Sequence, residues 1–340
     1  MMTTQTTSRN EVLDVVLGTE LVTLFKRGDI TEIYVNSDGY IRYLSGTEGK
    51  VITNIYLTDK QRAAIIELIA GQADKIVNED IPSISTEIRG YGYRFQGELP
   101  PIVKTPEFNI RKRATMVFTL DDYVANGTIT ENYKDYIENA ISLRKNILVV
   151  GGTATGKTTF LNAILEAMAR LSPFHRIISL EDLPELQCPA SDYSPMFTKQ
   201  ETNSEKSIKY NMTRLLRECM RRSPDRIVIG EVRDGCAYTM LKAWNTGHPG
   251  GACTVHANSA MSGINRIKSL AQEDPDSSSD IIKDLIGDAI DVIISIIHTD
   301  LGNGKRGRIV NEIIEVESFS EEKNTYITKV IPRKESINEK

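Results

Sequence analysis

The stretch Gly151-Gly-Thr-Ala-Thr-Gly-Lys-Thr-Thr159 decides the fold of the second half of the chain, because it has the complete Gly-x4-Gly-Lys-Thr spacing of a phosphate-binding loop. A short apolar run rich in β-branched residues, 146–150, precedes it and predicts a buried parallel strand. Apolar residues at helical spacing follow from Phe160 to Met168. A strand, a glycine-rich loop and a helix N-terminus in this order predict an anion site, where backbone N–H groups and the positive helix end converge.

In such a loop Lys157 reaches the β- and γ-phosphates and the Thr158 hydroxyl ligates Mg²⁺. An ordinary glycine-rich turn between strand and helix would require neither residue. The sequence therefore predicts a nucleotide site that takes ATP and Mg²⁺. The residues expected to contact the nucleotide from this loop are Gly151, Gly152, Thr153, Ala154, Thr155, Gly156, Lys157, Thr158 and Thr159.

Composition limits the possible classes of protein. The 340 residues are enough for two domains, and 40% hydrophobic with 26% charged residues is typical of a globular protein. A net charge of −5 argues against a general nucleic-acid-coating protein, and no sequence-specific nucleic-acid binding is expected. The four cysteines lack CxxC spacing, which favours reduced thiols in a cytosolic protein. No apolar run approaches the ~20 residues of a membrane span, so we expect a cytoplasmic protein with at most peripheral membrane contact.

The patterns along the chain predict a mixed N-terminal α/β domain over 11–117, a linker region over 118–129 and an ATPase domain over 130–335. The first domain is expected to pack a helix onto a hairpin of strands at 30–35 and 40–44. Thr58 is a candidate N-cap of its next helix. After Thr130, alternating helical and buried-strand patterns indicate a mainly parallel sheet covered by helices, and the tail from 309 suggests an antiparallel hairpin.

Two acidic segments follow buried-strand patterns and could serve hydrolysis, which needs a metal anchor and a group that positions water. The first is Arg226-Ile-Val-Ile-Gly-Glu231, and the second runs from Ile177 through Glu181 and Asp182. Parallel-sheet proteins place ligands at the C-terminal ends of core strands, which favours a catalytic role for these carboxylates. The alternative for the second segment is a plain acidic loop.

Two of the four histidines, His248 and His256, flank a Gly-Gly bend in the segment 246–258. A single histidine is more often structural, but this pairing favours a site. Neutral imidazole could contact a γ-phosphate or orient a catalytic carboxylate. Zinc is disfavoured because further ligands are not near in sequence.

These segments occur in the order of the Walker A, Asp box, Walker B and His box motifs, and the chain thereby resembles the secretion ATPases. The segment Ala-Trp-Asn-Thr-Gly-His-Pro-Gly-Gly at 243–251 is most similar to the corresponding segment of the TrbB-type conjugal transfer ATPases of type IV secretion systems. The resemblance continues into the first domain at 94–101 and 108–112, and covers roughly residues 20–300.

The resemblance implies a RecA-like P-loop NTPase domain preceded by an N-terminal domain that completes the nucleotide pocket. Proteins of this kind form homo-oligomeric rings, commonly hexamers, on the cytoplasmic face of the inner membrane. Their partners are the inner-membrane components of a secretion or conjugation apparatus. ATP turnover in them powers pilus biogenesis or substrate transfer.

The resemblance also implies roles for single residues. Glu231 matches the Walker B carboxylate, and Glu181, supported by Asp182 and Glu185, would help hold the metal or the attacking water. The metal would then be held by Thr158, Asp182 and Glu231, directly or through water.

The remaining residues of the resemblance come from both predicted domains. His248 and His256 would couple the γ-phosphate to neighbouring elements. Arg94 and Arg111 match first-domain arginines that touch the nucleotide. Arg233 is expected to be a structural or inter-subunit ion-pair partner.

Three rivals remain open. Pilus-retraction and type II secretion ATPases share the four motifs, although they usually have a hydrophobic residue where this chain has Pro249, and many type II ATPases carry paired CxxC motifs. A DNA translocase is disfavoured because the chain has no aromatic-interleaved basic tract. A nucleotide-binding ring scaffold without productive hydrolysis would be distinguished by measuring ATP turnover.

Overall fold

The computed structural model describes residues 3–45, 48–112, 117–199, 210–300 and 306–334. The chain divides into two compact units, Met1–Thr115 and Met116–Lys340. The elements of the first unit are α1 (Thr3–Lys26), β1 (Ile30–Val35), β2 (Tyr40–Ser45), β3 (Gly49–Tyr56), α2 (Asp59–Gln72), β4 (Ser83–Ile88), β5 (Tyr93–Glu98) and β6 (Glu107–Arg111).

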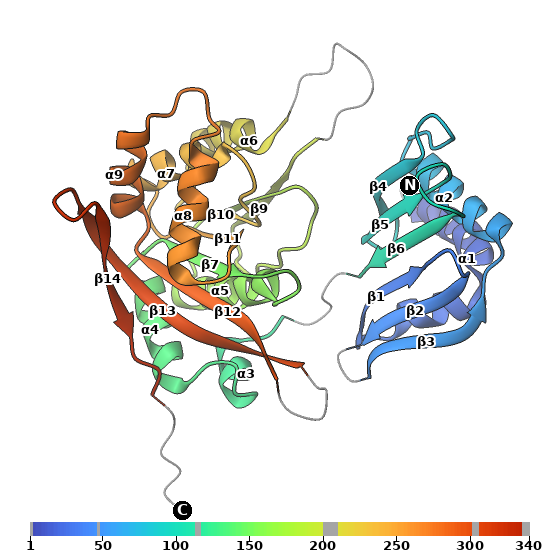
Figure 1. The fold of residues 1–340 in the computed structure, drawn as a ribbon, viewed down its shortest axis with the longest axis horizontal. Helices are drawn as coiled ribbons and strands as arrows, with labels where there is room; N and C mark the ends of the chain where they lie inside the picture. The colour runs from blue at the N-terminus through green and yellow to red at the C-terminus, as the bar shows by residue number, and fades with distance from the viewer. Residues whose placement is uncertain (1–2, 46–47, 113–116, 200–209, 301–305, 335–340) are drawn as a thin grey trace, which may run out of the picture. The chain divides into compact units, whose positions relative to one another are not determined.

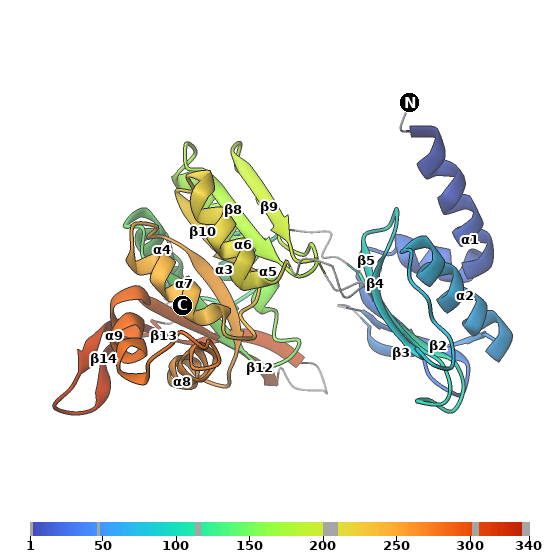
Figure 2. The same cartoon turned by 90° about the horizontal axis from the view of Figure 1, so that it is seen from above.

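The first unit is a six-stranded antiparallel sheet in the order β3-β2-β1-β6-β5-β4. Figure 2 shows α1 and α2 on the same face of this sheet. The predicted hairpin of β1 and β2 is confirmed. Thr58 caps α2 as predicted, in a capping box with Gln61, so two backbone donors at the helix start are satisfied.

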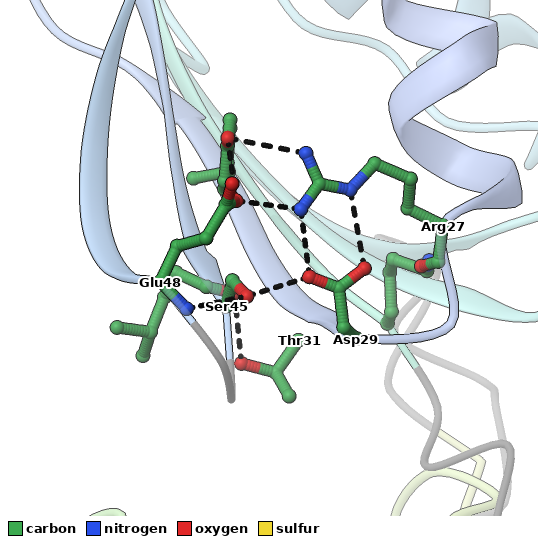
Figure 3. Close-up of polar contacts among 8 residues, drawn as sticks. Arg27, Asp29, Thr31, Ser45 and Glu48 are labelled. Carbon is green, nitrogen blue, oxygen red and sulfur yellow. Dashed lines mark hydrogen bonds and ion pairs between the residues drawn. The ribbon is translucent and has the colours of Figure 1, made fainter.

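A polar cluster around Arg27 fixes the connection between α1 and the sheet. The Arg27 guanidinium lies 2.7 Å from Asp29 Oδ2 and 2.6 Å from Glu48 Oε2, and the Ser45 hydroxyl donates to Asp29 Oδ2 at 2.6 Å. Figure 3 shows these groups converging, with the Thr31 hydroxyl bonded nearby to the strand backbone. The cluster ties the turn before β1 to the connection between β2 and β3.

The second unit begins with α3, so α3 belongs to this unit although the sequence placed 118–129 in a linker. Its elements are α3 (Leu120–Ala125), α4 (Glu131–Ser142), β7 (Ile147–Gly151), α5 (Lys157–Leu171), β8 (Ile177–Glu181), β9 (Tyr193–Phe197), α6 (Met212–Cys219), the 3₁₀ helix η1 (Met220–Arg222), β10 (Arg226–Ile229), α7 (Cys236–Asn245), β11 (Ala252–His256), α8 (Ala260–Ala271), α9 (Ser279–Ala289), β12 (Val292–Asp300), β13 (Arg306–Ser320) and β14 (Thr325–Ile331).

These strands form one sheet in the order β14-β13-β12-β7-β11-β10-β8-β9. The strands from β12 to β9 are parallel, whereas β13 and β14 are antiparallel additions at one side. The tail therefore forms the predicted antiparallel hairpin, but β13 starts earlier than residue 309 and continues the main sheet. The predicted fold class, a mixed α+β domain followed by a mainly parallel sheet covered by helices, is confirmed.

Helices cover both faces of the second sheet (Figure 1). In β7, Ile147 and Val149 pack in the core under α3, α4 and α5, whereas Leu148 and Val150 pack in the core under α6, α7, α8 and α9. Side chains alternate between the faces of a strand, so a strand that is apolar at every position is buried on both sides. This burial holds the ends of the parallel strands, where the site residues lie, in a fixed order.

Arg226 organises the edge of the sheet where the parallel strands begin. Its side chain is fully buried, and it donates to the carbonyls of Ile141 (2.8 Å) and Gly250 (2.9 Å) and to the Ser172 hydroxyl (3.1 Å). Its Nε also donates to His175 Nδ1 at 3.0 Å. Burial lowers the pKa of Arg226 to about 10, so the guanidinium is still charged at neutral pH and joins the ends of α4 and α5 to the loop before β11.

Candidate nucleotide site

The phosphate-binding loop connects β7 to α5 as the sequence predicts. A Cβ atom at Gly151 would lie 2.4 Å from the Ile296 carbonyl oxygen of β12, so the close strand packing there requires glycine. Gly156 has a φ of 94° and Ala154 a φ of 60°, both in the left-handed region. Among the described residues, no side chain caps the N-terminus of α5. Its first amide groups therefore remain available to an anion.

Lys157 is the first residue of α5 and is buried within the loop. Its Nζ donates to the Gly152 carbonyl at 2.8 Å, so the side chain curls back over the loop. Nζ also lies 3.3 Å from Nδ1 of His256. Thr158 and Thr159 follow in the first turn and are half-buried, while Thr153 and Ala154 are exposed at the loop surface.

His256 links the loop lysine to Glu231. It ends β11 in register with Gly151, and its Nε2 lies 3.2 Å from Glu231 Oε1. Because the lysine ammonium can only donate, we assign the neutral tautomer that accepts at Nδ1 and donates from Nε2. Burial, followed by the positive charge of Lys157, lowers the pKa of His256, which agrees with this assignment.

Glu231 follows β10 and is the carboxylate at the centre of the site. Its Oε2 accepts from Arg233 Nη2 at 2.6 Å while its Oε1 faces His256. Burial alone would raise the pKa of Glu231, but Arg233, His256 and Lys157 together outweigh that effect and lower it. The carboxylate is therefore ionised at neutral pH, as a metal-anchoring or water-positioning group must be.

The two carboxylates that follow β8 differ in their surroundings. Glu181 is buried, and its Oε1 accepts from the backbone N–H groups of Glu185 (2.9 Å) and Leu186 (2.7 Å). This bonding holds one oxygen of Glu181 in its own loop, and the role expected of Glu181 toward metal or water stays a prediction. Asp182 is half-exposed, and its Oδ2 lies 3.6 Å from Arg233 Nη1.

His248 lies at the end of the parallel strands opposite to the phosphate loop. It precedes β11, its Nδ1 is 3.3 Å from the Pro224 carbonyl before β10, and the next residue, Pro249, accepts a hydrogen bond from Arg144 before β7. The phosphate loop follows the other end of β7, so the length of a strand, roughly 17 Å, separates the two. Within one chain His248 therefore does not reach the phosphate site, contrary to the expectation that both histidines would.

Arg94 and Arg111 lie together in the first unit. They are register partners on β5 and β6. The apolar neighbours Phe95 and Ile110 point into the core under the helices, so both arginines occupy the other face of the sheet. The structure thus brings the two predicted arginines onto one surface of their own unit.

Arg308 is a positive residue near the loop that the sequence did not single out. A Cβ atom at Gly156 would lie 3.2 Å from its Nη1, so the guanidinium rests against the loop. It reaches this place because β12 pairs with β7 and β13 pairs with β12, with Arg308 opposite His298. Some 150 residues separate the two positions in sequence, and no short motif marks them.

The oxygen donors present suit Mg²⁺, because that ion prefers carboxylate, hydroxyl and phosphate oxygens. Thr158 offers such an oxygen from the first turn of α5, and Asp182 and Glu231 offer theirs just after β8 and β10. Within the described part of the chain, no group of three or more His, Cys, Asp and Glu side chains is arranged to hold a metal by itself. Metal binding here would therefore depend on the phosphates of the nucleotide.

A model of the family described as type II/IV secretion system protein matches residues 49–324. The chain belongs to this family. The sequence resemblance to secretion ATPases is thereby confirmed, and the chain is a P-loop NTPase of the type II/IV secretion ATPase family.

Among sequence relatives, this secretion ATPase is 40% identical over 308 residues to the probable conjugal transfer protein TrbB of Sinorhizobium fredii, covering 91% of this chain and 90% of the relative. It is 30% identical to the type IV secretion system protein VirB11 of Bartonella henselae, covering 80% and 85%. The crystal structure of the pilus retraction motor PilT with bound ADP shares the fold, with a TM-score of 0.59 at 19% identity over 85% of this chain and 80% of that one.

Both sequence relatives belong to conjugal or type IV systems, the branch that the segment 243–251 indicated. In the residues that the structure describes, no helix has the length and apolarity that crossing a bilayer would require.

Proposed function

We propose that this secretion ATPase hydrolyses ATP as the motor of a type IV secretion or conjugation system. The observation that carries the proposal is the row of contacts Lys157–His256–Glu231–Arg233 beside the phosphate loop. Lys157 follows β7, His256 ends β11, and Glu231 and Arg233 follow β10. An ordinary glycine-rich turn has no need of such a row. A phosphate site with an ionised carboxylate beside it has the parts that phosphoanhydride hydrolysis requires.

In this mechanism the α5 amides and Lys157 hold the β- and γ-phosphates. Glu231 orients the attacking water. His256 contacts both Lys157 and Glu231, and so couples the binding of the γ-phosphate to the position of the Glu231 carboxylate. Bound Mg²⁺ would supply charge neutralisation to the phosphates, with Thr158, Asp182 and Glu231 as the residues that hold it, directly or through water. Glu181 keeps the loop after β8 in shape through its bonds to the backbone.

Further positive charge would come from residues outside the motifs. Arg308 lies where it can contact the nucleotide from the β13 side of the loop. Arg94 and Arg111 are proposed to touch the nucleotide as well, through the first unit. Charge that develops on the transferred phosphoryl group is stabilised best by fixed donors of this kind.

The relatives suggest which assembly the protein forms and with which partners it works. We propose a homo-oligomeric ring, hexameric as in proteins of this kind, that works with inner-membrane components at the cytoplasmic face of the membrane. Conjugal transfer is the process in the name of the TrbB relative, and pilus biogenesis or substrate transfer would be the output here.

The test is ATP turnover by the purified protein, with particle mass recorded with and without ATP and Mg²⁺. Lys157→Ala and Glu231→Gln should each lower turnover by on the order of 10² to 10³. The first removes a positive charge that stabilises the phosphates in the transition state, and the second removes the carboxylate that orients the attacking water. Arg170→Ala, which removes a surface partner of Glu138, is the matched control and should leave turnover unchanged. A ring that binds ATP but hydrolyses none, even with lipid present, would overturn the motor and support a scaffold.

A further inference from the structure

Arg233 is shared by the two accessible carboxylates of the site. Its Nη2 lies 2.6 Å from Glu231 Oε2, and its Nη1 lies 3.6 Å from Asp182 Oδ2. Asp182 is held from its other side by the Thr198 hydroxyl, which donates to Oδ1 at 2.9 Å. One guanidinium therefore joins the ends of β10 and β8.

The oxygens that face Arg233 are also those that suit Mg²⁺. A guanidinium and a divalent cation both neutralise carboxylates, and their repulsion disfavours simultaneous close contact. Since Oε1 of Glu231 faces His256, Oε2 is the oxygen that metal or metal-bound water would reach most directly. The Arg233 guanidinium already contacts that oxygen.

Arg233 also has space into which it can move. Half of its side chain is exposed, and it lines a cavity of about 200 Å³ together with Asp182, Thr198, Tyr210, Glu231 and Asp234. Neither His256 nor Lys157 lines this cavity. A rotation about its flexible stem would carry the guanidinium into this space without any change in the sheet.

We propose that Arg233 is a positioning residue that acts as an internal counter-ion of Glu231 and Asp182 and is exchanged for Mg²⁺ when metal-bound nucleotide enters the site. It neutralises the charge of both carboxylates and holds them in place in the absence of metal. Its displacement sets the concentration of Mg²⁺ that the site requires. This role rests on the proposed nucleotide site. It adds that Arg233 determines how much Mg²⁺ is needed for the metal to bind there.

The proposal makes opposite predictions with and without metal. Without Mg²⁺, Arg233→Gln leaves two carboxylates uncompensated beside the phosphates, so nucleotide binding should weaken. With Mg²⁺, the same substitution removes a competitor of the metal, so the metal should bind at lower concentration. A residue that merely supports the fold would weaken binding under both conditions.

The experiment measures binding of a fluorescent methylanthraniloyl derivative of ADP in EDTA and across a Mg²⁺ titration. In Arg233→Gln the Mg²⁺ concentration of half effect should fall by on the order of tenfold, as expected when a cation in contact with both carboxylates is removed. Arg233→Lys, which retains a flexible cation, should lie between wild type and Arg233→Gln. The surface variant Arg170→Ala should match wild type in both conditions.

Two further arms separate this proposal from the one on which it rests. Lys157→Ala should weaken binding of the same ADP derivative; if it does not, the proposed nucleotide site is wrong. If Lys157→Ala weakens binding but Arg233→Gln leaves the Mg²⁺ midpoint unchanged, or raises it, the counter-ion role alone is refuted. Adding Asp182→Asn and Glu231→Gln to Arg233→Gln should abolish the fall in the Mg²⁺ midpoint, since the metal would then lack its carboxylates.

Discussion

Replacing Gly151 by alanine should deform the phosphate loop from its first residue. The added Cβ would lie 2.4 Å from the Ile296 carbonyl oxygen and 2.5 Å from Thr155 Oγ1. Ile296 belongs to β12, a strand paired on both sides within the sheet, so the first contact cannot be relieved by a side-chain rotation. Overpacking of this kind costs about 1–3 kcal/mol of unfolding free energy. In a unit of this size that corresponds to a fall in Tm of roughly 2–12 °C.

Gly152→Ala is the matched control, since the neighbouring glycine has room. Its added Cβ would find Thr155 Cγ2 as the nearest atom at 3.7 Å, an ordinary contact. Its unfolding free energy should therefore stay within about 0.5 kcal/mol of wild type. Urea unfolding measures both variants, and binding of the fluorescent ADP derivative should weaken in Gly151→Ala. If Gly151→Ala is as stable as Gly152→Ala and binds nucleotide like wild type, the tight approach of β12 to the loop is not what requires glycine there.

Three further predictions use residues at the two edges of the sheet. His256→Ala should lower ATP turnover by on the order of 10². His248→Ala should leave binding of the ADP derivative unchanged, and weaker binding in this variant would contradict the placement of His248. Burial, then the charge of Arg226, lowers the pKa of His175, so its contribution to stability is complete above about pH 6.5 and is lost as pH falls through the folded value. Wild type should therefore lose unfolding free energy on acidification more steeply than His175→Gln, measured by urea unfolding at pH 7 and pH 5; parallel losses would exclude the histidine. Arg308→Ala should weaken nucleotide binding in EDTA severalfold, about the value of one charge-assisted contact, and an unchanged affinity would remove this residue from the site.

Local features of the sequence predicted local structure well. The predicted N-cap Thr58 does begin α2, in a capping box with Gln61, because such a cap depends only on residues three positions apart. The phosphate loop is equally local, since its glycines and Lys157 belong to one turn. β3 was missed because its alternation of exposed and half-buried residues is weakly apolar, and β9 because Pro195 interrupts an edge strand.

The features that the sequence could not supply depend on which strands are neighbours. Proximity in the chain suggested that His248 and His256 act together, but a whole strand separates them along the sheet. Arg308 and Gly156 show the opposite case, far apart in sequence and in contact in space. Glu181 and Asp182 are adjacent in sequence, yet one points into its own loop and the other toward Arg233.

The order of strands in space explains why His256 connects the lysine to Glu231. In the chain, β8 and β10 precede β11, but in the sheet β11 is inserted between β7 and β10. Its last residue therefore projects between the phosphate loop and the carboxylate, and a polar side chain there can contact both. A parallel register shift by one residue would turn His256 to the other face of the sheet. The register of β11 with β7, from Ala252 opposite Ile147 to His256 opposite Gly151, is thus the structural condition for any signal that passes from phosphate to Glu231.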